Sequence, residues 1–141
     1  MTAEVKLTIV CGLPEGKEFV FRDRTVGTVG RADDCLLRLP CDLAHRDVSR
    51  HHCLLDIDPP AIRVRDLGSR NGTYVNGTKI GQRRPGITPE AVLGFDMPER
   101  PLDDGDELRI GGTVFRVSIC GAKEVRFERR RVNDDSEVLV G

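Results

Sequence analysis

The sequence lacks several features that mark common protein classes. Its 141 residues include no tryptophan and one tyrosine, and no apolar run approaches the roughly 18 residues of a membrane-spanning helix. The first six residues contain no apolar core of a secretory signal peptide. The chain has no Gly-Lys-Ser/Thr phosphate-binding loop. Its 22 basic and 23 acidic residues leave a net charge of −1, which disfavours nucleic acids and acidic membranes as partners.

The cysteines do not form a disulfide framework or a common metal-binding motif. There are five, an odd number, and no two are separated by the two residues of a CxxC motif. Without a signal peptide, this usage favours free thiols in a reducing compartment. We therefore predict a cytoplasmic protein.

Length and composition predict one folded domain. A chain of 141 residues is long enough to bury a core without disulfide or metal support. We expect the domain to span residues 1–121 and a polar tail to span 122–141, where the sequence becomes dense in charge. The oligomeric state stays open.

Short runs of β-branched and alternating apolar residues dominate the sequence. Val5, Leu7 and Ile9 lie on one face of the first predicted strand. Turn dipeptides such as Asn71-Gly72 and Asn76-Gly77 separate later runs. This pattern is typical of an all-β sandwich. The predicted strands cover residues 5–10, 18–21, 25–29, 35–39, 52–57, 61–66, 73–75, 107–110 and 113–119.

One helical turn is predicted, over residues 87–93. Thr88 is a suitable N-cap, Pro89 suits the first helical position and Gly94 ends the turn. The surrounding residues 81–100 contain three prolines and three glycines and read as a long loop. Within that loop, Gln82-Arg83-Arg84 and Phe95-Asp96-Met97 are candidates for an accessory partner surface.

Three loops carry the parts of a phosphate-binding site. A phosphorylated side chain is best matched by guanidinium groups, a hydroxyl donor and backbone N–H groups. The first loop contains Gly30-Arg31, the second covers residues 48–52 and the third covers residues 66–73. Each lies at the end of a predicted strand, and their spacing leaves open whether they converge.

These segments resemble the signatures of forkhead-associated (FHA) domains. Gly30-Arg31, Ser49-Arg50-His51-His52 and Asn71-Gly72 are similar to the family's Gly-Arg, Ser-x-x-His and Asn-Gly motifs. The string DLGSRNGTYVNG at 66–77 and the Leu-x-x-Gly-Asp segment at 102–106 add to the resemblance, which covers roughly residues 5–120. It implies a mostly antiparallel two-sheet sandwich of about eleven strands. It also implies recognition of phosphothreonine without catalysis, cofactor or metal. The link at 81–100 is longer than is usual in the family.

The resemblance also implies roles for individual residues. Arg31 would pair with the phosphate, Ser49 would donate its hydroxyl to it, and Arg50 would add a phosphate contact. Arg70 stands where the family often has a residue that reaches the phosphate. Asn71 matches the residue that binds the peptide backbone beside the phosphothreonine.

Four further residues are expected to support the site. His52 matches the signature histidine, which in the family holds the loops together. Gly30 belongs to the Gly-Arg signature, and Gly72 and Thr73 would shape the Asn-Gly turn.

Other chemistries have weaker support. Ser49, His51 and Asp47 could suggest a hydrolase triad, but no nucleophile elbow surrounds them. Strand alternation puts His52 and Cys53 on opposite faces, which argues against a zinc site. The candidate zinc ligands in the sequence are Cys41, His45, His51, His52 and Cys53.

The sequence thus predicts a phosphothreonine-dependent recognition module and adaptor in Ser/Thr kinase signalling. Its expected partner is a phosphothreonine-containing protein or peptide, such as a Ser/Thr kinase or its substrate. The alternative is a phosphate-independent interaction module that uses a sheet face or the 81–100 insertion.

Overall fold

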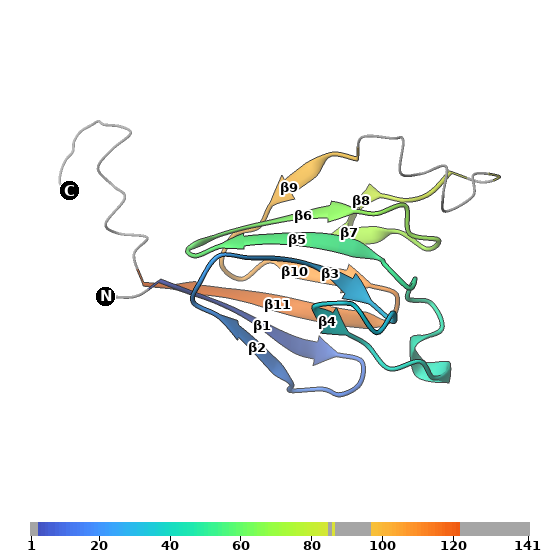
Figure 1. The fold of residues 1–141 in the computed structure, drawn as a ribbon, viewed down its shortest axis with the longest axis horizontal. Coiled ribbons are helices and arrows are strands. Elements are labelled where there is room, and N and C mark those ends of the chain that lie inside the picture. Colours follow the sequence, from blue (N-terminus) through green and yellow to red (C-terminus); the bar gives the residue numbers. More distant parts are fainter. Residues whose placement is uncertain (1–2, 85, 87–96, 122–141) are drawn as a thin grey trace.

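Eleven β-strands form two sheets in the computed structural model, which describes residues 3–84, 86 and 97–121 (Figure 1). The six-stranded sheet contains, in spatial order, β2 (Glu18–Phe21), β1 (Glu4–Cys11), β11 (Thr113–Cys120), β10 (Glu107–Ile110), β7 (Thr73–Val75) and β8 (Thr78–Gly81). The five-stranded sheet contains β4 (Leu37–Arg38), β3 (Thr25–Gly30), β5 (Cys53–Asp58), β6 (Ala61–Asp66) and β9 (Glu99–Pro101). The β3–β4 pair is parallel and the other described pairs run antiparallel. The predicted two-sheet, mostly antiparallel sandwich is confirmed.

The core lies between the sheets and follows the alternation of the strands. Val5, Leu7 and Ile9 of β1 are buried, as their period-two spacing predicts. In the other sheet Leu55 and Ile57 of β5 are fully buried in the same hydrophobic cluster. Burial of these apolar faces is the main favourable contribution to the stability of the sandwich.

The sequence prediction missed two strands, β8 and β9, and made β4 too long. Residues 35–39 were expected to form a strand, but only Leu37 and Arg38 pair with β3. The segment 81–100, predicted as loop, contains the end of β8 at Gly81 and the start of β9 at Glu99. Among the described strands β9 pairs with β6 alone and forms the edge of its sheet, where Pro101 is tolerated.

A short 3₁₀ helix, η1 (Leu43–His45), was also missed. Its N-cap is Asp42, whose side chain accepts from the His45 N–H. Three residues carry too little periodicity to be read from a sequence. The predicted helical turn at 87–93 and the predicted tail at 122–141 lie outside the described residues.

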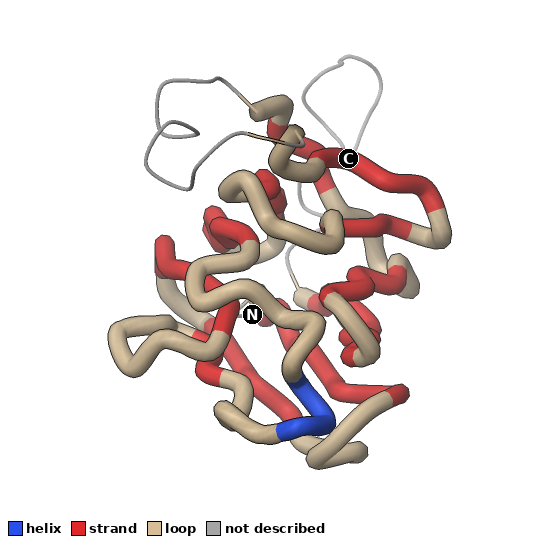
Figure 2. The backbone as a smooth tube through the Cα atoms, turned by 90° about the vertical axis from the view of Figure 1, so that its right-hand side faces the viewer, coloured by secondary structure: helices blue, strands red, loops and turns tan. Residues whose placement is uncertain are grey.

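Strand direction gathers three loops at one end of the sandwich. β5 runs antiparallel to both β3 and β6. One end of this sheet therefore carries the end of β3, the start of β5 and the end of β6. Figure 1 shows this end of the sandwich at the right, and Figure 2 views the loops end-on, with η1 in blue beside them.

Candidate functional site

A hollow of about 650 Å³ lies among these loops. All three predicted phosphate-binding loops contribute to its lining, so they do converge. The five residues that the sequence singled out for ligand contact all line it: Arg31, Ser49, Arg50, Arg70 and Asn71.

The first two loops are joined by backbone hydrogen bonds. The Arg31 N–H donates to the Ser49 carbonyl (3.3 Å), and the Ala32 N–H donates to the Arg50 carbonyl (3.0 Å). A Cβ atom on Gly30 would lie 2.1 Å from the Arg50 carbonyl oxygen, so only glycine permits this approach. The predicted supporting role of Gly30 thus has a steric basis.

Arg31 lines the hollow and also forms a hydrogen bond within the protein. Its Nε donates to the Val48 carbonyl at 2.5 Å, which holds the half-buried side chain against the second loop. The resemblance to the family implies only the pairing of this side chain with the phosphate, so the internal contact is an addition. Its guanidinium also has two terminal nitrogens, each able to donate to an anion.

Ser49 and Asn71 join the second loop to the third. The Ser49 Oγ accepts a hydrogen bond from the Arg70 N–H at 3.0 Å, which leaves the hydroxyl hydrogen able to donate to a ligand. The Asn71 Nδ2 donates to the Asp47 carbonyl at 3.0 Å. Its carbonyl oxygen can therefore accept a further bond.

His52 is a buried bridge between the same loops. Its Nδ1 accepts from the Ser49 N–H (3.0 Å), so Nε2 carries the proton and donates to the Gly72 carbonyl (2.9 Å). The bond that Nδ1 accepts requires the neutral imidazole, since a protonated ring donates from both nitrogens. Burial lowers the pKa of His52 below its usual 6.5, although the Gly72 carbonyl and the charge of Asp66 oppose that change. The histidine holds the loops and does not line the hollow.

Asp66 organises the third loop, a role that the sequence analysis missed. Its Oδ1 accepts from the hydroxyls of Ser69 (2.5 Å) and Thr73 (2.6 Å). Its Oδ2 accepts from the N–H groups of Gly68 (2.8 Å) and Ser69 (3.0 Å). The Ser69 Oγ in turn accepts from the Gly72 N–H at 3.0 Å. In a sequence, such a turn is indicated by an aspartate that precedes a glycine by two residues and a serine by three.

The lining carries two arginines that the sequence analysis did not assign to the site. Arg46 follows η1, and Arg83 follows β8. The Arg83 N–H donates to the Ser69 carbonyl (2.8 Å), which fixes its backbone beside the third loop. The sequence predicts Gln82-Arg83-Arg84 as part of an accessory partner surface, whereas Arg83 lines the hollow. Arg46 has no distinguishing sequence signal.

Of the residues that the structure describes, one group has the chemistry and spacing of metal ligands. Ligand atoms of Asp34, Cys35 and His51 lie within 4.8 Å of one another. The His51 Nε2 and an Asp34 oxygen already form an exposed pair at 2.7 Å, which lowers the pKa of Asp34. This group shares only His51 with the cluster that the sequence analysis weighed for zinc. All five cysteines, each within the described residues, are unpaired.

Comparisons with known proteins agree with the geometry. Residues 27–90 match the family model for the FHA domain. The chain is 32% identical to mouse (Mus musculus) angiogenic factor with G patch and FHA domains 1, over 92% of the chain and 18% of that protein. It is 33% identical to an ABC transporter ATP-binding/permease protein of Mycobacterium tuberculosis, over 74% of the chain and 10% of that protein.

Solved structures share the fold. A domain from a structural and functional analysis of phosphothreonine-dependent FHA domain interactions is 26% identical, with a TM-score of 0.61, and the match covers 84% of this chain and 98% of that one. The FHA domain of FhaA, solved with the intracellular domain of Rv3910, is 27% identical, with a TM-score of 0.58. That match covers 80% of this chain and 98% of the other.

The chain spans less than a fifth of the length of these two curated relatives. Within the described residues, no helix is long and apolar enough to cross a membrane.

Proposed function

We propose, from the premise that this chain belongs to the forkhead-associated family, that the chain recognises phosphothreonine in a partner protein. The roles suggested for Arg31, Ser49, Arg50, Arg70 and Asn71 form part of this proposal. In it the domain spans residues 1–121, carries no cofactor or metal and catalyses no reaction. The partner is a phosphorylated protein of Ser/Thr kinase signalling in the cytoplasm.

The observation that carries the proposal is the charge of the hollow. Five arginines line it, from all three motif loops and the two segments beside them. Among the described residues, no carboxylate forms an ion pair with any of them. Unpaired guanidinium groups gathered in one hollow repel each other. A phosphate relieves that repulsion, because it brings about −1.5 to −2 charges and three acceptor oxygens.

The relatives support the same function. The solved domain with 26% identity comes from work on phosphothreonine-dependent FHA interactions, and the domain with 27% identity was solved with the intracellular domain of another protein. In this chain the Ser49 hydroxyl and the Asn71 carbonyl can complete the recognition, the first at the phosphate and the second at the peptide backbone.

Fluorescence polarisation with three matched peptide pools tests the proposal. The pools carry phosphothreonine, phosphoserine or unmodified threonine at one position among randomised neighbours. We expect binding to the phosphothreonine pool and much weaker binding to the others. Equal binding in all three pools, or none, would contradict the proposal and favour a phosphate-independent module.

Two variants locate the binding to the hollow. Arg50 suits this test because its described hydrogen bonds use only its backbone carbonyl. R50Q is expected to weaken phosphothreonine binding by about tenfold or more, since a hydrogen bond to a charged group contributes about 1.5–3 kcal/mol. R22Q is the matched control, because Arg22 pairs with Glu4 on an exposed part of the surface. It should bind as the wild type does.

A further inference from the structure

Five arginines of the sheet surfaces pair with carboxylates: Arg22 with Glu4, Arg24 with Asp56, Arg63 and Arg65 with Glu99, and Arg116 with Glu107. Other strand arginines have no described carboxylate partner, among them Arg109, which lies over the Tyr74 ring. Within the described ranges, none of the five arginines of the hollow has such a partner. What distinguishes the hollow is that five arginines without a described carboxylate partner gather there.

One phosphate does not balance this charge. Among the lining residues the only carboxylate is that of Asp47, against five guanidinium groups, which leaves a surplus of four positive charges. Phosphothreonine supplies about two negative charges at most. A ligand that neutralises the hollow must therefore carry one to two further negative charges, since the carboxylate of Asp34, outside the lining, also interacts with the charge of Arg50.

The additional positive charge comes from outside the three motif loops. Arg46 caps the end of η1, and the next turn is closed by the Val48 N–H, which donates to the His45 carbonyl at 2.9 Å. On the other side, the Gln82 Nε2 donates to the Arg70 carbonyl at 2.7 Å and holds the segment that carries Arg83. The backbone under both arginines is thus tied to the site, while the side chains have no described partner.

We propose that Arg46 and Arg83 form an anion-binding rim that selects phosphothreonine segments with additional negative charge next to the phosphothreonine. This inference rests on the proposed function and adds the class of sequence that the site prefers. Two chemical groups supply the charge: aspartate or glutamate side chains, and a second phosphorylated residue. Both present oxygen anions that a guanidinium group binds through paired N–H donors.

The test uses four fluorescent peptides of one length and the whole chain. The first carries phosphothreonine among neutral residues, the second has glutamates on both sides of it, the third has a second phosphothreonine, and the fourth has the glutamates around unmodified threonine. The glutamate peptide is expected to bind wild-type protein about tenfold more tightly than the neutral one, the effect of two or three ion pairs of the partly exposed kind. The third peptide shows whether phosphate exceeds carboxylate at the rim.

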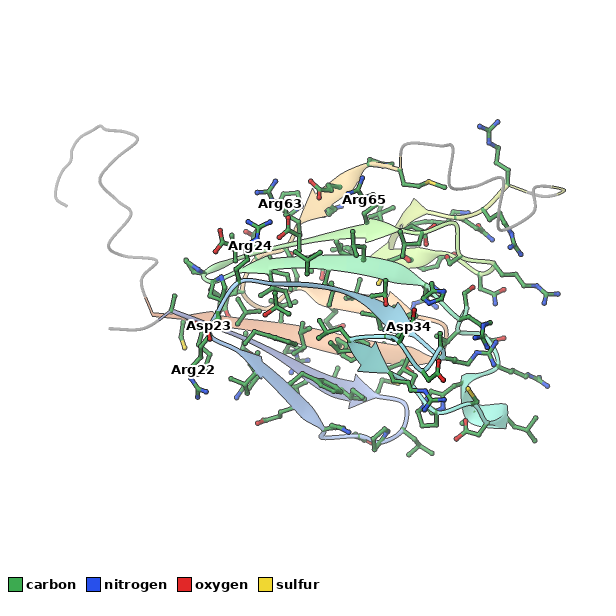
Figure 3. All side chains as sticks on the ribbon, in the orientation of Figure 1. Arg22, Asp23, Arg24, Asp34, Arg63 and Arg65 are labelled. Carbon is green, nitrogen blue, oxygen red and sulfur yellow. The ribbon has the colours of Figure 1, made fainter. Side chains whose placement is uncertain are left out.

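A double variant and a matched control assign the preference to the rim. R46Q/R83Q should lose most of the tenfold preference, measured as the ratio of its affinities for the glutamate peptide and the neutral phosphothreonine peptide. R22Q/R63Q removes an equal number of positive charges from the sheet surfaces and should keep the full preference for the glutamate peptide. In Figure 3, Arg22 and Arg63 lie toward the end of the sandwich opposite Asp34, which stands at the loop end. Circular dichroism and thermal melting check that each variant is folded.

The outcomes separate the two proposals. If the neutral phosphothreonine peptide binds but glutamates add nothing, or the preference survives in R46Q/R83Q, the rim is refuted and the proposed function stands. Binding of the unphosphorylated glutamate peptide as tightly as the phosphorylated one refutes the rim as a selector of phosphothreonine segments. If no phosphothreonine peptide binds, the proposed function is refuted together with the rim.

Discussion

Removal of the Asp66 carboxylate is expected to destabilise the fold and the binding site together. The side chain is 1% exposed and accepts hydrogen bonds from four donors in residues 68–73. D66A leaves those donors without their acceptor. D66N keeps one oxygen and replaces the other with an amide. T73V removes one of the four donors and retains the shape of the side chain.

The expected losses follow from the number of bonds. A hydrogen bond to a charged group contributes about 1.5–3 kcal/mol, so T73V should lower the free energy of unfolding by about that amount. D66A should lower it by at least twice as much, with D66N between the two. Since small domains have only about 5–15 kcal/mol in total, the D66A protein should be close to unfolding at room temperature.

Urea denaturation followed by circular dichroism measures the series. Phosphothreonine-peptide affinity is measured in parallel, under conditions where each variant is folded. Because Arg70 and Asn71 lie in the loop that Asp66 holds, D66N should also weaken peptide binding, although Asp66 itself does not line the hollow. A D66A protein within 1 kcal/mol of wild type, or a series in which T73V loses most, would refute this reasoning.

Two further predictions concern the loops and pH. G30A should lower the free energy of unfolding by about 1–3 kcal/mol or more and weaken peptide binding, because its Cβ would meet the Arg50 carbonyl oxygen at 2.1 Å. G112A is the control, since nothing lies within 4 Å of a Cβ there. Equal stability of the two variants in urea would contradict the prediction. For His52, whose pKa is lowered in the folded protein by burial, the unfolded chain binds a proton that the folded chain resists, so stability should fall as the pH drops below about 6.5. Denaturation at a series of pH values should show a shallower fall for H52Q, and an identical slope in wild type and H52Q would overturn the assignment.

Much of the architecture can be read from local sequence. The alternation of Val5, Leu7 and Ile9 predicts a half-buried strand, and the structure buries all three. Asn76-Gly77 predicts a tight hairpin, and both residues have positive φ between β7 and β8. These signals are local, because period-two burial and left-handed backbone depend on neighbours in the chain. The edge strand β9 has no such signal, since among the described strands it forms by pairing with β6, which is distant in the sequence.

The candidate site divides in the same way. The Gly-Arg, Ser-x-x-His and Asn-Gly segments identify which residues carry phosphate chemistry, and all five residues assigned to ligand contact line the hollow. Their convergence depends on β5 running between β3 and β6, and sheet order is set by contacts between distant segments. The same is true of Asp66, whose four bonds form only when the turn closes, and of Arg46 and Arg83. These two arginines reach the hollow because η1 and β8 are brought beside the loops, so their sequence identifies them only as charged residues, and the tertiary structure makes them part of the site.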